Sequence, residues 1–269
     1  MIGPFWQYQL PLWVVVFIFL TLLLIPMELG FRFGVRRKSL QPASEGEAAS
    51  DVTLTAMLAL LGLMLAFTYS FSLSRADLRK VALVDEVNAI GTAFLRADLL
   101  PEPGRSRLRQ LLSDYARSRY VEPGTVRTLG EVQKVVAHSV EIQSKLWPTL
   151  KSALRDPGDL SYPEKALLIS AVNEVLDCHT RRIAIFYDRL PTAVLGLLVL
   201  VAAASLSMAA YSLALRGQFN RLRMTAFALV LTSLMFIILD YDMAMRGLIQ
   251  VDHRSLVVLI DEMRSAIQR

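Results

Sequence analysis

The chain has 269 residues, of which 54% are hydrophobic, and its 29 Lys and Arg against 24 Asp and Glu give a formal net charge of +5. Soluble globular domains are usually about 45–50% apolar, so the excess indicates an integral membrane protein whose surroundings include the lipid bilayer. The basic residues form no continuous stripe and accompany no nucleic-acid-binding motif, which excludes a nucleic-acid partner. The single Cys178 excludes an internal disulfide framework.

The sequence contains no motif that marks a catalytic nucleophile, a phosphate-binding loop or a metal site. His138, His179 and His253 stand far apart, and no HExxH, CxxC, GxSxG or Walker pattern occurs. We therefore expect no enzymatic activity, no metal and no cofactor. The three histidines are assigned to structural or exposed positions.

The first apolar run extends from Leu10 to about Met27, close to the roughly 20 residues that a membrane-spanning helix needs. It has no basic segment before it and no small-residue cleavage site after it. This pattern indicates an uncleaved span and not a signal peptide. Pro26 and Glu28 are expected to end the helix.

The segment from Asp51 to Leu100 organises the chain. It begins as a span from Val52 to about Leu73 and continues without a proline into a charged but periodic stretch. Fifty helical residues make a rod about 75 Å long, whereas a bilayer core is about 30 Å thick. One continuous helix is therefore expected to cross the membrane and then form the core of an extramembrane domain. The expected core stripe comprises Leu78, Val81, Val84, Val87, Ile90, Phe94 and Leu95.

Further helices are predicted over residues 105–119, 125–154 and 161–190. The last begins with a capping box, in which Ser161 and Glu164 satisfy each other's backbone N–H groups.

Two more spans follow, over residues 192–213 and from 224 to about 239. The first of these is rich in Ala, Ser and Gly, which allow helices to approach closely in lipid. A final amphipathic helix is predicted over residues 256–267.

These elements predict an all-α membrane protein with four transmembrane helices in a 2+2 arrangement and a helical extramembrane insert between the pairs. The side that the insert faces stays open. The first span has no Lys or Arg before it and four after it, which favours an outside N-terminus, yet the flanks of the insert are basic too. The expected domains are a first transmembrane pair (1–74), a helical extramembrane domain (75–190), a second transmembrane pair (191–242) and a C-terminal amphipathic helix (243–269).

Two blocks of sequence resemble the bestrophin-like family of bacterial membrane proteins. The first comprises Leu61-Gly-Leu-Met-Leu-Ala-Phe67 and Asp85-Glu86-Val-Asn88-Ala-Ile-Gly91-Thr-Ala-Phe-Leu-Arg96-Ala-Asp-Leu-Leu-Pro101. The second comprises Asp188-Arg-Leu-Pro191 and Leu239-Asp240-Tyr-Asp242, followed by Arg246 and Gly247. The chain departs from the family pattern at Asp85, where Glu is usual, and at Met243-Ala244, where Arg-Pro is common. The resemblance implies a multi-pass protein of the bacterial inner membrane with a remote likeness to the pentameric bestrophin anion channels.

Bestrophins line a narrow neck with three apolar residues at spacing i, i+4, i+8 in the second span. Leu63, Phe67 and Phe71 have this spacing, so the resemblance implies stacked apolar rings that gate by dewetting. Ordinary contact with lipid or with another helix is the alternative for these side chains. The polar Arg-Thr-Asn of bestrophins is replaced by Thr68-Tyr69-Ser70.

The polar residues of the family motifs are further site candidates. Asp85, Glu86 and Asn88 either make caps and interhelical hydrogen bonds within the insert or lie at a pore mouth. Asp240 and Asp242 are expected to pair with Arg246 or Arg75 in preference to binding a cation, because carboxylates at i and i+2 do not share a helix face. The candidates are Arg75, Asp85, Glu86, Asn88, Arg96, Asp240, Asp242 and Arg246.

The resemblance implies a homo-oligomeric ion channel, with a pentamer as the bestrophin example, whose pore is formed by the second span. Small inorganic ions would pass, with anions favoured. The alternative is a non-conducting membrane sensor or assembly protein whose helical insert binds a partner.

Overall fold

The computed structural model describes residues 10–40, 47–122, 125, 129–155, 160–243, 248 and 251–268, and every regular element within these ranges is helical. The elements are α1 (Leu12–Leu40), α2 (Glu47–Arg96), the short 3₁₀ helix η2 (Ala97–Leu99), α3 (Gly104–Arg119), α4 (Leu129–Ala153), α5 (Tyr162–Tyr187), α6 (Thr192–Arg216), α7 (Arg221–Asp242) and α8 (Arg254–Ile267). Among the described residues, four stretches are long and apolar enough to cross a membrane. Three of them lie in α1, α2 and α7. The third in chain order covers α5 and α6 together, and we place the span in α6 because α5 carries many charged residues. The prediction of an all-α protein with four such helices is confirmed.

Helix α2 is unbroken over 50 residues. The expectation that no loop interrupts it between Phe71 and Leu83 is confirmed, and η2 follows it directly.

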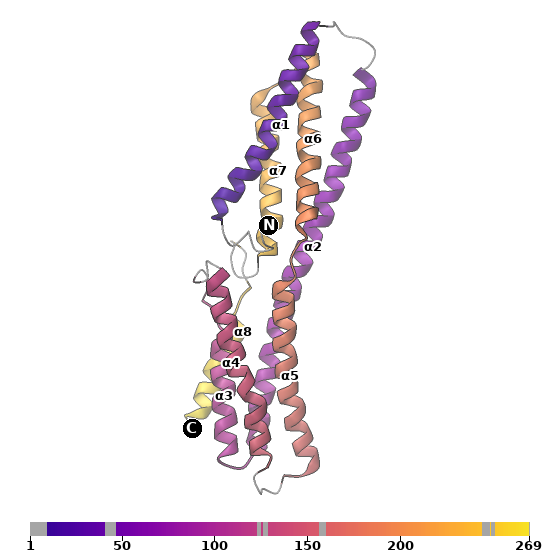
Figure 1. Ribbon diagram of the computed structural model, residues 1–269. Helices are drawn as coiled ribbons and strands as arrows, with labels where there is room; N and C mark the ends of the chain where they lie inside the picture. Colours follow the sequence, from indigo (N-terminus) through magenta and orange to yellow (C-terminus); the bar gives the residue numbers. More distant parts are fainter. Residues whose placement is uncertain are drawn as a thin grey trace. The chain divides into compact units, whose positions relative to one another are not determined.

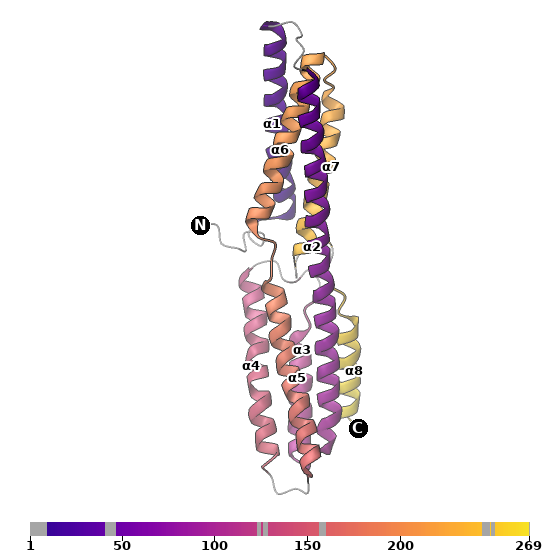
Figure 2. The same ribbon diagram turned by 90° about the vertical axis from the view of Figure 1, so that its right-hand side faces the viewer.

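The helices form two compact units. The first unit comprises Met1–Ser74 and Arg189–Met243, and the second comprises Arg75–Asp188 and Ala244–Arg269, so α2 contributes to both. In the first unit, α1 lies alongside α6 and also contacts α7 (Figures 1 and 2). In the second unit, α3 packs against α4 and α8, and α4 packs against α5 (Figure 2).

Two glycines one helical turn apart bring α1 very close to α6. A Cβ atom on Gly30 would lie 2.1 Å from the backbone oxygen of Ser207, and one on Gly34 would lie 2.7 Å from the Cβ of Ala214. Small residues at this spacing favour helix association in lipid, where packing rather than burial from water supplies the attraction. The contact between α1 and α6 therefore depends on these two positions.

Helix α1 does not end at Pro26, as the sequence predicted, but continues to Leu40. A proline costs the helix one backbone hydrogen bond, and membrane helices tolerate this loss when neighbouring helices pack around it. The continuation lies against α6. Glu28 accepts hydrogen bonds from Arg32 Nε at 3.0 Å and from Arg221 Nη2 at 3.3 Å.

We expect Gly30→Ala to destabilise the first unit by about 1–3 kcal/mol, because the added methyl group overlaps the backbone of α6 and forces the helices apart. Gly196→Ala is the matched control, since a Cβ atom there meets nothing within 4 Å. Thermal unfolding in detergent should show a lower melting temperature for Gly30→Ala and an unchanged or higher one for the control. Equal shifts in both variants would contradict the close contact.

The core of the second unit joins the second half of α2 to the four other helices. Its buried side chains include Leu83, Ile90, Phe94, Leu108, Leu112, Leu146, Leu150, Leu168, Val175, Leu256 and Met263.

The core stripe predicted for α2 is only partly correct. Val87, Ile90 and Phe94 are buried, but the structure exposes Leu78, Val81, Val84 and Leu95. The helix presents a different face to the core, because small or charged residues fill several core positions. These are Ala82, Glu86, Ala89 and Ala93.

Helix α5 begins at the predicted capping box. Ser161 Oγ accepts from the backbone N–H of Glu164 at 3.4 Å, and the backbone N–H of Ser161 donates to Glu164 Oε2 at 2.8 Å. The helix ends at Tyr187 and not at Leu190, whose backbone is disfavoured in a helix by the proline that follows it.

Candidate functional site

The apolar part of α2 contacts its own chain least among the four candidate spans. It is 11% buried, against 28% for α1 and 39% for each of the stretches in α6 and α7. Its buried side chains, Leu61, Thr68 and Ser72, lie on one side of the helix. Met64 and Leu65 are partly buried against the core of the first unit, and Tyr69 contacts the ring of Tyr241, so the exposed residues occupy only the remaining part of the helix surface.

A stripe of large apolar side chains occupies the exposed side of α2. Leu63, Phe67 and Phe71 are 54%, 59% and 63% exposed, and Leu60, one turn before Leu63, lies on the same face. We call these four residues the α2 apolar face. It contains all three residues that the resemblance assigns to a pore.

A second candidate lies in the second unit, where the carboxylate of Glu86 is 1% exposed. Tyr115 Oη donates to Glu86 Oε1 at 2.6 Å, and Arg119 Nε donates to the same oxygen at 2.9 Å. Arg182 Nη1 donates to Glu86 Oε2. Three helices, α2, α3 and α5, thus meet at one buried carboxylate with two guanidinium groups.

Two further side chains complete this network. Arg119 Nη1 donates to Ser139 Oγ at 3.2 Å, which adds α4 to the three helices. His179 Nδ1 lies 2.8 Å from Tyr115 Oη. Because the tyrosine hydroxyl gives its proton to Glu86, its oxygen accepts from His179, whose proton is therefore on Nδ1.

The network shifts the protonation of its members. Burial opposes ionisation of Glu86, but Arg119 and Arg182 outweigh it and hold the pKa of this carboxyl below its ordinary value. Burial and the charge of Glu86 raise the pKa of Tyr115, which keeps the hydroxyl protonated. Burial and the neighbouring Arg119 lower the pKa of His179 to about 4.

These shifts predict an acid-sensitive second unit. The unfolded chain protonates His179 near pH 6.5, whereas the folded chain keeps it neutral down to about pH 4. The unfolded state thus binds more protons in this window, and the free energy of unfolding falls as the pH drops, by up to about 1.4 kcal/mol per pH unit. Stability contributed by Glu86 is present above its ordinary pKa and is lost at still lower pH.

Melting temperatures measured from pH 7.5 to 4.5 test this expectation. His179→Asn, which keeps an N–H near Tyr115 but does not titrate, should flatten the pH dependence. His138→Asn, at an exposed position, is the control and should leave the pH dependence of the melting temperature unchanged. An unchanged slope in His179→Asn would show that other groups control the acid response.

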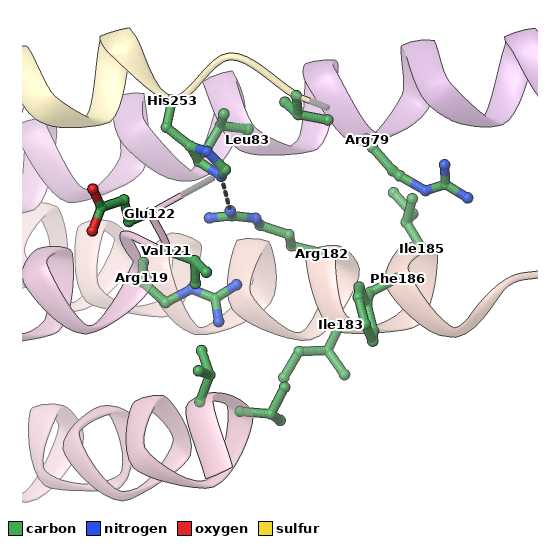
Figure 3. A pocket seen from close by; sticks show the side chains of 13 residues that line it. Arg79, Leu83, Arg119, Val121, Glu122, Arg182, Ile183, Ile185, Phe186 and His253 are labelled. Carbon is green, nitrogen blue, oxygen red and sulfur yellow. Dashed lines mark hydrogen bonds between the residues drawn. The ribbon is translucent and has the colours of Figure 1, made fainter. Parts of the chain in front are cut away.

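A cavity adjoins the network. It encloses about 70 Å³ that a water-sized molecule can reach. Figure 3 shows Arg119 and Arg182 directing their guanidinium groups toward its middle, with His253 beside Arg182. The lining residues are Arg79, Leu83, Arg119, Val121, Glu122, Val135, Val136, Arg182, Ile183, Ile185, Phe186, Val251 and His253.

The other polar candidates on α2 do not join the Glu86 network through any hydrogen bond or ion pair recorded among the described residues. Arg75 Nε donates to Asp188 Oδ2 at 3.2 Å, and Arg96 Nη1 donates to the carbonyl of Leu167 at 3.1 Å. Asp85 lies 3.5 Å from Arg181 in a half-exposed ion pair. Asn88 is exposed.

The acidic pair at the end of α7 is buried. Asp242 Oδ1 accepts from the backbone N–H of Leu190 at 3.0 Å, and the carbonyl of Asp242 accepts from Arg189 Nη1 at 2.7 Å. Asp240 is 1% exposed. Arg246, one of the two partners that the sequence suggested, lies outside the described residues, and Arg75, the other, donates from Nε to Asp188.

Sequence reasoning identified Glu86 but missed the groups that bind it. Tyr115, Arg119 and Arg182 belong to helices distant in sequence, and arginines near a helix end are usually solvated. One signal was available, since a glutamate at a core position of α2 must be paired to be buried.

The described residues contain no group of three or more His, Cys, Asp or Glu placed to hold a metal ion. In the part of the chain that the structure describes, the eight α-helices, four of them apolar enough to cross a membrane, define the class as an all-helical, multi-pass membrane protein. The family model described as "Bestrophin-like domain" matches residues 14–256. The chain belongs to the bestrophin-like family.

Solved structures share its fold. A point mutant of a bacterial bestrophin homologue from Klebsiella pneumoniae is 11% identical, with a TM-score of 0.67 over 94% of this chain and 99% of that one. A second point mutant from the same organism is 12% identical, with a TM-score of 0.63 over 92% and 97%. A point mutant described as a membrane protein is 12% identical, with a TM-score of 0.68 over 94% and 99%. No curated protein matches the chain.

Proposed function

We propose that the chain is the protomer of a homo-oligomeric ion channel of the bacterial inner membrane, with its pore formed by α2. The observation that carries the proposal is the α2 apolar face. Leu63, Phe67 and Phe71 lie one turn apart on the helix that contacts its own chain least. Membership of the bestrophin-like family supports the same function.

A pore on one helix per chain requires several chains around an axis. Each chain would then contribute Leu63, Phe67 and Phe71 to three stacked rings. Apolar rings of this size exclude water and keep the resting pore nearly closed. The proposal includes a pentamer by analogy with the bestrophin channels.

We further propose that the four spans are arranged as two pairs, 1–74 and 191–242, around an extramembrane insert formed by residues 75–190. The boundaries of the two compact units, at residues 74/75, 188/189 and 243/244, support this division. The proposed preference for anions is made by analogy with the bestrophin anion channels.

Two measurements on the purified protein test the function. The mass of the detergent-solubilised particle should correspond to several copies of the chain. Liposomes that contain it should release chloride faster than empty liposomes when valinomycin carries the compensating potassium. Without valinomycin, the reversal potential in a KCl gradient should lie nearer to that of chloride than to that of potassium. A monomer that passes no ions over a range of pH and calcium concentration would favour the non-conducting sensor or assembly protein.

A further inference from the structure

The cavity beside Glu86 has two chemically different sides. The charged and polar lining comprises Arg79, Glu122, Arg119, Arg182 and His253. The last three, which lie close together in Figure 3, are called the polar side. The apolar side comprises Leu83, Val121, Val135, Val136, Ile183, Ile185, Phe186 and Val251. A ligand that fits both sides carries a charged or polar head and a small apolar body.

The polar side has an excess of positive charge. Arg119 and Arg182 share the single carboxylate of Glu86, and both oxygens of that carboxylate already accept hydrogen bonds. Glu122 also lines the cavity, but it is exposed and makes no ion pair with any residue that the structure describes. The guanidinium group of Arg119 is buried and that of Arg182 is partly buried, so with one carboxylate between them they leave a positive charge that attracts a second anion.

His253 adds a donor that lacks an acceptor. Arg182 Nη2 lies 3.4 Å from His253 Nε2, and because a guanidinium can only donate, Nε2 is the accepting nitrogen. The proton of the neutral ring is therefore on Nδ1, which is buried and has no hydrogen-bond partner among the described residues. A buried N–H without an acceptor is costly, so an acceptor that enters the cavity would gain this bond.

We propose that this cavity binds a small organic carboxylate. Its carboxylate would pair with the guanidinium groups of Arg119 and Arg182, whose planar donors match two carboxylate oxygens. Its body would contact the valine and isoleucine side chains of the apolar side. A cavity of about 70 Å³ limits the body to a few carbon atoms. The inference concerns the second unit alone and does not depend on ion conduction.

The test uses isothermal titration of the full-length protein in detergent with sodium butyrate. We expect saturable binding of one butyrate per chain. Butyramide, which has the same shape but no charge, and sodium sulfate, which has charge but no apolar body, should each bind at least tenfold more weakly. Sulfate that binds as tightly as butyrate, or butyrate that does not saturate, would overturn the proposal.

Two variants locate the site. Val136→Trp fills the cavity from α4 without changing a charged group, and should lower butyrate affinity at least tenfold. Val140→Trp, at an exposed position on the same helix, is the matched control and should bind as the wild type does. Retained affinity in a folded Val136→Trp protein would place the site elsewhere and overturn the proposal. If Val136→Trp does not fold, His253→Ala decides, because loss of the Nδ1 donor should weaken butyrate binding several-fold, and unchanged affinity would refute the site.

Discussion

Replacing Glu86 with Ala is expected to reduce the free energy of unfolding of the second unit by about 3–5 kcal/mol. The substitution leaves Arg119 and Arg182 close together in the core with no carboxylate between them. Removing one partner of a buried ion pair lowers the free energy of unfolding by about this amount, because the remaining charges stay desolvated and unpaired. Tyr115 loses its acceptor as well.

The neighbouring residue supplies the control. Asp85 also pairs with an arginine, Arg181, but both side chains are about half exposed. Asp85→Asn should therefore cost no more than about 1 kcal/mol. Melting in detergent gives the size of each effect, and hydrogen exchange should locate the loss of protection for Glu86→Ala in α2, α3 and α5. Equal effects at the two positions would show that Glu86 is not a buried structural charge.

A second expected result concerns the pore. Phe67→Ala with Phe71→Ala should raise the flux of ions through reconstituted protein several-fold. If copies of α2 surround an axis, the two phenylalanines form the bulkiest apolar rings of the α2 apolar face, and removing them widens and wets the constriction.

Phe17→Ala is the control for side-chain type and exposure. Phe17 is a phenylalanine of α1 that is 65% exposed, close to the values of Phe67 and Phe71. On a surface that faces lipid, the same truncation opens no path for ions, and the flux should match the wild type. If Phe17→Ala also raised the flux, or if the double variant did not raise it, the result would contradict the proposal that α2 lines the pore.

The long elements were predictable because apolar runs and breakers define them locally. The unbroken α2, the start of α5 at Ser161 and the four apolar stretches all follow from sequence patterns. The end of α1 did not follow. Pro26 is a strong local signal, but Gly30 packs against Ser207 on a helix about two thirds of the chain length away, and this tertiary contact outweighs the proline.

The site was harder to predict, because burial depends on partners that the local sequence does not name. Glu86 and Asp85 are adjacent carboxylates, yet one is buried among two arginines and the other lies near the surface. The predicted core stripe of α2 was partly wrong for the same reason, since by residue type alone Val81 is a better candidate for the core than Glu86. Val81 is exposed and Glu86 is buried because of where α3 and α5 pack against α2, which the local sequence does not show.

Both units are completed late when a ribosome makes the chain. The partners of Glu86 lie later in the sequence, Arg119 by 33 residues and Arg182 by 96 residues. Gly30 likewise packs against Ser207, which is synthesised much later, on α6. At about 5–20 residues per second, the carboxylate of Glu86 has its second arginine only after roughly 5–20 s. During that time the nascent α2 carries an incompletely paired charge and an uncovered core face, so biogenesis of this protein should depend on factors that hold the emerging helix until α5 is made.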